Sequence, residues 1–89
     1  MSIATRTVEI QDPVGIHARP ASAFAQEAAG SGCKVTITRE SDKASADAAS
    51  VLMIMSLGIA KGDTITISVD GEDAENKADK LVKTLLENE

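Results

Sequence analysis

The single histidine of the chain, His17, lies where a loop leads into a predicted helix, in the segment 15–21 (GIHARPA). Proline lacks an N–H and fixes its own φ, so Pro20 suits a first helical turn, where backbone donors have no intrahelical partner. We therefore predict that His17 is the N-cap residue. An anion held there would be stabilised by free backbone donors, by the helix dipole and by the charge of Arg19. Phosphate is the anion we expect.

Other roles for His17 are weaker. A lone histidine is usually a solvated or core side chain, but a structural cap would more naturally be Ser, Thr, Asp or Asn. A histidine that activates another nucleophile would have that nucleophile or an orienting carboxylate nearby, and neither is evident. What remains is an imidazole that becomes the nucleophile and carries a group covalently. An autonomous enzyme is disfavoured, because the sequence offers no second convergent catalytic group.

Composition excludes several classes of function. The 89 residues carry a net charge of −5 and one aromatic side chain, which argues against a nucleic-acid partner. The single cysteine, Cys33, cannot form an internal disulfide and lacks metal-ligand spacing with the histidine, so we expect a small buried side chain and no metal or cofactor. The N-terminus has no apolar signal region, and no apolar run is long enough to cross a membrane. We expect one domain, residues 1–89, in the cytoplasm.

Hydrophobic periodicity predicts the elements that would position His17. Alternation predicts strands over 3–10, 33–39 and 64–69, with a weak short strand at 43–46. A helix over 18–29 should bury a stripe of Ala21, Phe24, Ala25 and Ala28. A C-terminal helix from residue 72 should bury Ala74, Ala78, Leu81, Val82, Leu85 and Leu86. This order predicts an α+β fold, an open-faced β-sandwich of topology β-α-β-β-α-β-α, with a four-stranded antiparallel sheet and three helices on one face.

A second segment, 50–62 (SVLMIMSLGIAKG), contains a run of five apolar residues. Ser50 as N-cap favours a short helix there, ended by Gly58. Five consecutive apolar residues on a short helix cannot all face inward, so we expect part of the run on the surface as a partner interface. The alternative is that these residues are core, which we expect in part of Met53 or Ile54. The residues we assign to the interface are Val51, Leu52 and Met55.

The two segments, in this order and in one short chain, resemble the HPr family, the histidine-containing phosphocarrier proteins of the bacterial phosphoenolpyruvate-dependent sugar phosphotransferase system. The resemblance implies the same fold. It also implies that His17 accepts phosphate on Nδ1 from the phosphohistidine of enzyme I and passes it to sugar-specific IIA proteins. Arg19 would stabilise the phosphate, and Val51, Leu52 and Met55 would dock both partners. We expect a monomer that is a covalent carrier rather than an enzyme.

Ser50 falls where Gram-positive members of that family carry a regulatory serine. In those members a kinase/phosphorylase modifies the serine, and the phosphorylated form binds a catabolite-control repressor. Here Asp47 and Ala49 occupy positions where Asn and Lys are expected, so the alternative is that Ser50 is only a cap. Val14 likewise replaces a small polar residue near the histidine.

Two other functions stay open. One is a phosphocarrier of the nitrogen-related branch, with a different enzyme I partner. The other is chiefly a regulatory interaction protein that uses phosphorylated Ser50. The presence of His17 with Arg19 speaks against regulation as the only role, because regulatory-only relatives typically lack the histidine.

Overall fold

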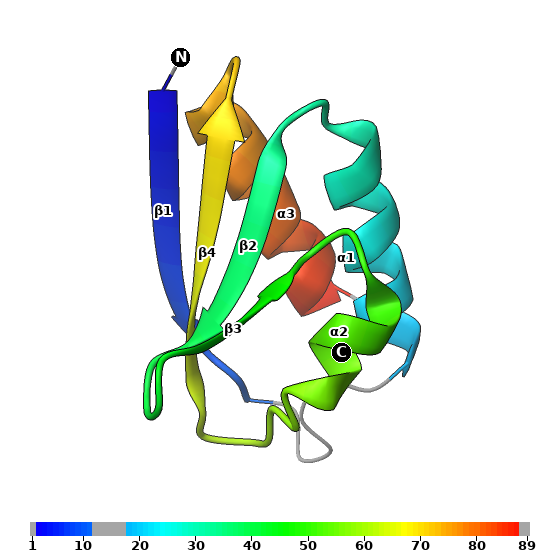
Figure 1. Cartoon of the computed structure of the whole chain (residues 1–89), viewed down its shortest axis with the longest axis vertical. Helices are drawn as coiled ribbons and strands as arrows, with labels where there is room; N and C mark the ends of the chain where they lie inside the picture. Colours follow the sequence, from blue (N-terminus) through cyan, green and yellow to red (C-terminus); the bar gives the residue numbers. More distant parts are fainter. Residues whose placement is uncertain (1, 12–17, 88–89) are drawn as a thin grey trace.

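Alternating β-branched residues build the central strand of the sheet. In the computed structural model, which describes residues 2–11 and 18–87, Ile65, Ile67 and Val69 are fully buried, and Thr66 and Ser68 between them are partly exposed. The strands are β1 (Ser2–Glu9), β2 (Lys34–Arg39), β3 (Ala44–Asp47) and β4 (Thr64–Gly71). They form a four-stranded sheet in the order β1-β4-β2-β3, and all neighbours are antiparallel. The last strand in sequence is thus inside the sheet (Figure 1).

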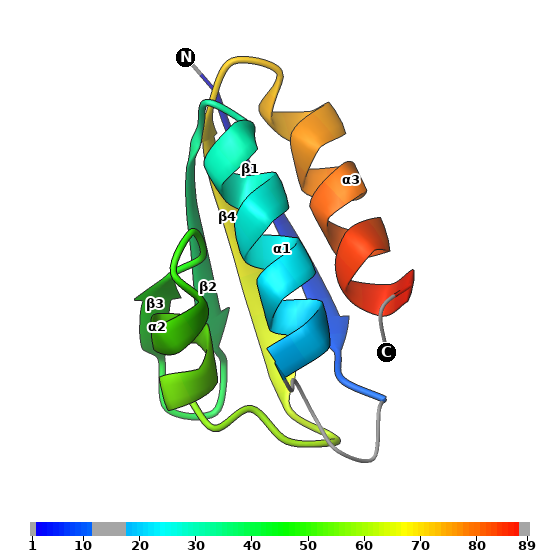
Figure 2. The same ribbon diagram turned by 90° about the vertical axis from the view of Figure 1, so that its right-hand side faces the viewer.

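The helices are α1 (Ala18–Gly30), α2 (Val51–Ser56) and α3 (Ala74–Glu87). Figure 2 shows them in front of the sheet, with α1 and α3 side by side and α2 in front of β3. The predicted α1 stripe is confirmed, since Ala21, Phe24, Ala25 and Ala28 are all buried. Small side chains on this stripe let α1 pack closely on the sheet. The expected α+β fold with its open antiparallel sheet is therefore confirmed.

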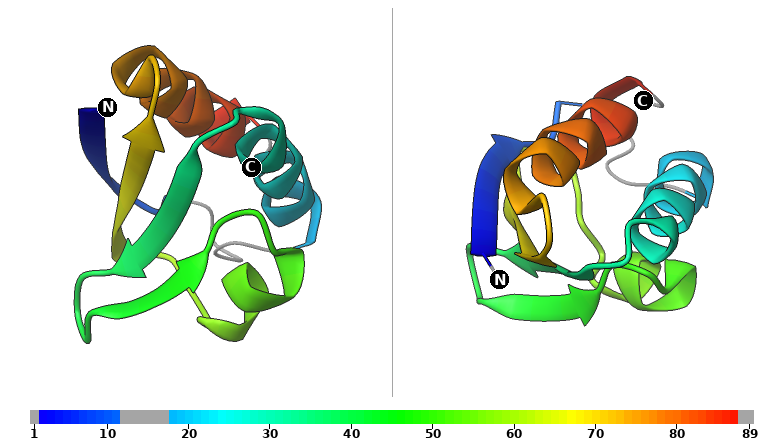
Figure 3. Two further views of the ribbon diagram at one scale, coloured as in Figure 1. Left: turned by 45° about the horizontal axis from the view of Figure 1, so that its top comes forward. Right: turned by 90° about the horizontal axis from the view of Figure 1, so that it is seen from above.

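The strongly twisted sheet curls around α1 and α3, as seen from above in Figure 3. One prediction for α3 is wrong: Leu86 is exposed, although the helical pattern assigned it to the buried face. Successive helical residues are about 100° apart, so with Leu85 buried Leu86 turns away from the sheet. Val82 and Cys33, which were also expected to be buried, are half-buried against the core. The other differences are shifts of one or two residues at element ends, which are the least sharply defined positions of any element.

Candidate functional site

His17 lies outside the described residues, so its predicted role as an N-cap stays a prediction. Helix α1 begins at Ala18, the next residue, and Arg19 is exposed in its first turn. On the other side, Ile10 is buried, its N–H donates to the Asp63 carbonyl at 2.9 Å, and its carbonyl accepts from the Gly62 N–H at 2.8 Å. The chain that leads toward the histidine segment is therefore fixed to the loop before β4.

Ser50 caps α2 as predicted. Its backbone is extended, at φ −112° and ψ 114°, and its hydroxyl accepts a hydrogen bond from the Met53 N–H at 3.3 Å. The turn before it is tied down by Asp47, whose carbonyl accepts from the Ser50 N–H at 3.1 Å and whose carboxylate accepts from the Ala49 N–H at 3.0 Å. Ala48 is fully buried and its N–H donates to the Val35 carbonyl. The position of the cap thus depends on β2 as well as on the local turn.

The exposed apolar residues of α2 form what we call the α2 surface: Leu52, Met53 and Met55. Leu52 is 82% exposed, and the two methionines are each a little under half exposed. Ile54, at 1%, is the residue that anchors the helix in the core, and Val51 is half-buried against the core. The expectation that part of this run faces solvent is confirmed. Of the three residues assigned to the interface, Val51 contributes least exposed area.

The first turn of α1 and the α2 surface lie at the same end of the molecule. Figures 1 and 2 both show the start of α1 next to α2, at the end of α1 opposite to the turn that leads into β2. Helix α2 carries no charged residue, and Arg19 is the only cation of α1. The surface formed by α2 and by the first turn of α1 is therefore apolar with one positive charge.

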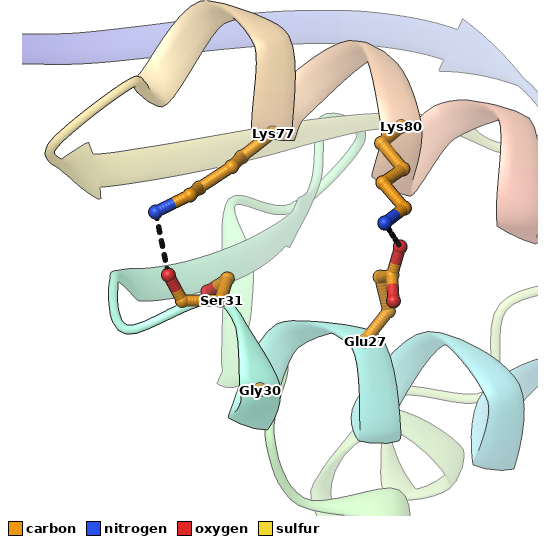
Figure 4. Close-up of a pocket in the computed structure, with 5 residues that line it drawn as sticks. All are labelled: Glu27, Gly30, Ser31, Lys77 and Lys80. Carbon is orange, nitrogen blue, oxygen red and sulfur yellow. Dashed lines mark hydrogen bonds and ion pairs between the residues drawn. The ribbon is translucent and has the colours of Figure 1, made fainter.

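The hollow at the opposite end of α1 is not a second anion site. It has a volume of about 320 Å³ and contains two lysines, one on each side of Figure 4. Lys77 Nζ donates to the Ser31 carbonyl at 2.6 Å, and Lys80 Nζ lies 3.4 Å from a carboxylate oxygen of Glu27. Lys77 therefore joins α3 to the turn after α1, and Lys80 joins α3 to α1.

Arg39, at the end of β2, contacts the C-terminal end of α2. Its Nη1 donates to the carbonyl of Leu57, the C-cap residue. The guanidinium also makes two bonds to Asp42, Nε to Oδ1 at 3.0 Å and Nη2 to Oδ2 at 2.7 Å. These bonds, and the Ala44 N–H, lower the pKa of Asp42 to about 2. Sequence analysis did not find this cluster, because only the fold brings residue 57 to the end of β2.

The described residues offer neither a metal site nor a membrane-crossing helix. Residues 2–11 and 18–87 contain no group of three or more His, Cys, Asp or Glu side chains that could hold a metal ion. Neither α1, α2 nor α3 has the length and apolarity of a membrane-crossing helix. Cys33 is half-buried just before β2, where its thiol donates to the Glu72 carbonyl at 3.4 Å.

Comparison with known proteins identifies the family. Residues 4–87 match the family model described as "PTS HPr component phosphorylation site". The phosphocarrier protein HPr of Streptomyces coelicolor is 38% identical over 85 residues, covering 96% of this chain and 90% of the relative. HPr of Mycoplasma genitalium is 44% identical over 78 residues, covering 88% and 86%.

Solved structures agree with this assignment. The structure of a mycoplasma histidine-containing phosphocarrier protein superposes with a TM-score of 0.88 at 33% identity, covering 94% of this chain and 93% of that one. A family match over nearly the whole chain and a matching fold lead to one conclusion. The chain belongs to the HPr family of phosphocarrier proteins of the phosphotransferase system.

Proposed function

We propose that this protein carries a phosphoryl group on Nδ1 of His17, taking it from phosphorylated enzyme I in the cytoplasm and passing it to sugar-specific IIA proteins. The observation that carries the proposal is the position of Arg19, exposed in the first turn of a helix that begins one residue after the histidine, in a chain of this family. In each transfer the bond from phosphorus to the donor nitrogen breaks as a bond to the acceptor nitrogen forms. The protein is a carrier in this exchange, and its partners complete the catalysis.

The start of α1 and Arg19 suit a phosphoryl group that is bound and released reversibly. A helix N-terminus stabilises an exposed charge by only about 0.3 to 1 kcal/mol, which holds the phosphoryl group without trapping it. Arg19 adds hydrogen bonds that strengthen as negative charge develops on the phosphoryl oxygens. The same positive field disfavours imidazolium, so His17 would stay neutral and nucleophilic near neutral pH.

We assign partner docking to the exposed apolar residues of α2. Leu52 and Met55 of the α2 surface, with the half-buried Val51, would lie against enzyme I and against IIA proteins in turn. Methionine adapts its shape to different surfaces, which suits a protein that must bind two partners through one surface. Such exchanges need brief contacts, and a patch of three exposed apolar side chains supports a contact of that kind.

The test is transfer from purified enzyme I charged with labelled phosphoenolpyruvate. The wild type should acquire acid-labile phosphate that maps to His17, and His17→Ala should acquire none while keeping its circular dichroism spectrum. A His17→Ala variant that still acquires acid-labile phosphate would refute the assignment. Running the nitrogen-branch enzyme I in parallel separates the two branches, because the physiological donor should give the higher kcat/KM.

We further propose that Ser50 is a regulatory phosphorylation position. Ser50 is half-buried and its hydroxyl already accepts from the Met53 N–H, and a phosphate there would stand next to the α2 surface that we propose docks partners. Asp47 in the same turn opposes the added charge, which favours a cap-only role. Incubation with an ATP-dependent HPr kinase/phosphorylase, followed by phosphosite mapping, distinguishes a regulatory role of Ser50 from a cap-only role. Modification at Ser50 that slows transfer to His17 supports regulation, and binding of the modified form to a catabolite-control repressor would extend it.

A further inference from the structure

The position of α2 depends on few contacts. It has six residues, and a helix so short is marginal without tertiary support. Ile54 is its only buried residue, and Leu57 beyond its end is buried as well. Ser50 caps one end. The contacts at the C-terminal end of α2 therefore determine how the α2 surface is oriented.

Arg39 holds that other end. The last turn of α2 contains no basic residue, although the carbonyls at a helix C-terminus carry partial negative charge and favour a cation. The guanidinium of Arg39 supplies the cation from β2, 18 residues away in sequence, by donating to the Leu57 carbonyl. Directly after this contact, Gly58 turns the chain away at φ +65°.

Asp42 fixes the guanidinium in the orientation that reaches α2. The two parallel bonds between Arg39 and Asp42 leave one Nη free to point at Leu57. Asp42 Oδ1 also accepts from the Ala44 N–H at 3.2 Å, which ties the pair to the start of β3. The Arg39 side chain is only 19% exposed. Since the pKa of Asp42 is lowered to about 2, the carboxylate stays ionised throughout the physiological range.

We propose that Arg39 is a positioning residue for phosphotransfer: it fixes the C-terminal end of α2 to the β2–β3 hairpin and so sets the α2 surface at the angle that partners recognise. The proposal rests on the proposed function, because it needs the α2 surface to dock enzyme I. Arg39 contacts the Asp42 carboxylate and the Leu57 carbonyl. It acts through the backbone of Leu57, and Asp42 acts through Arg39.

A matched control exists on β1, at the edge of the sheet opposite to β3. Arg6 on β1 also bonds one carboxylate at 2.7 Å, that of Asp79 on α3, and its side chain is 31% exposed. It joins a strand to a helix, as Arg39 does, but the helix is α3. Arg39→Ala and Arg6→Ala should therefore cause similar losses in the urea midpoint while differing in their effect on α2.

Two measurements on the full chain test the proposal. In steady-state transfer from enzyme I charged with labelled phosphoenolpyruvate, Arg39→Ala should raise the KM for the carrier about fivefold, the low end of the usual range for coupling through a repositioned element. Its kcat should stay unchanged, and Arg6→Ala should match the wild type. In amide hydrogen exchange, Arg39→Ala should speed exchange of Leu57 and Gly58, whose N–H groups bond to carbonyls of α2. Arg39→Lys, which can still donate to Leu57, should recover part of the KM.

Each result has a defined meaning. Equal KM values for Arg39→Ala and Arg6→Ala, or unchanged exchange at Leu57 and Gly58, would overturn the positioning role and leave the proposed function intact. If the wild type accepts no phosphate from enzyme I, the proposed function fails and the positioning role for transfer fails with it. A fall in kcat at constant KM would place Arg39 in the transfer step itself, which also overturns the proposal.

Discussion

Replacing Leu52 with alanine separates docking from folding. Folding buries less than a fifth of this side chain, because 82% of it is exposed. The substitution removes about three methylene equivalents, each contributing about 0.8 kcal/mol when fully buried. The free energy of unfolding should therefore fall by only about 0.4 kcal/mol.

A partner that covers Leu52 would bury the rest of it. The remaining four-fifths corresponds to about 2 kcal/mol, or about a 30-fold loss of affinity when contact is complete. The free energy that Leu52 contributes to a real interface is smaller than this maximum, because ordering the side chain on binding costs conformational entropy. We expect the KM for the carrier in transfer from enzyme I to rise between about fivefold and about 30-fold.

The assay combines the rate of labelled phosphate transfer at varied carrier concentration with urea unfolding of the same samples. Ile3→Ala is the control, since Ile3 is an apolar side chain of the same size, 67% exposed on β1 and away from α2. It should leave KM unchanged. The reasoning is refuted if Leu52→Ala transfers with wild-type KM, if Ile3→Ala raises KM as much, or if Leu52→Ala lowers the unfolding free energy by more than about 1 kcal/mol.

Three further predictions concern the support of α2. Ile54→Ala should lower the free energy of unfolding by about 2 to 5 kcal/mol, because it leaves a cavity under the helix; a urea midpoint near that of the wild type would contradict this. Ser50→Ala should cost about 1 kcal/mol and speed amide exchange at Met53, whereas Ser50→Asp should keep the cap and the slow exchange. Asp42 has a pKa lowered from 3.8 to about 2, so its ionised form stabilises the fold above pH 3.8, and this stability is lost as pH falls toward 2. Asp42→Asn should therefore lose less stability than the wild type between those two pH values in urea titrations, and parallel losses would show that the Arg39 pair contributes nothing.

Periodicity was sufficient for most of the individual strands and helices because burial here follows local patterns, whereas the family resemblance was the stronger argument for the topology. The alternation in β4 and the stripe of alanines around Phe24 each depend on residues close in sequence, and both are as predicted. The Ser50 cap was predictable for the same reason, since its acceptor and the Met53 donor are three residues apart. Elements defined by neighbouring residues can be inferred from the chain alone.

Contacts between distant residues were not predictable in this way. The bond from Arg39 to Leu57 exists because the sheet brings the end of β2 next to the end of α2, and no spacing in the sequence indicates it. Leu86 was assigned to the wrong face because a helical stripe does not show which of two adjacent leucines faces the sheet. The role of His17 came from its segment and from the family resemblance, and it stays a prediction.

The order of strands in the sheet has a consequence for how the protein is made. β1 and β2 each pair with β4, and β4 is formed by residues 64–71, after the histidine segment and after α2. During synthesis at about 5 to 20 residues per second, α2 is complete for about one to three seconds, and α1 for about two to eight seconds, before the whole of β4 exists. Long-range pairing of this kind also slows folding. A nascent chain that stops before β4 would therefore contain the segments 15–21 and 50–62 without the strand that pairs with β1 and β2. We expect the protein to accept phosphate only after β4 has been inserted into the sheet.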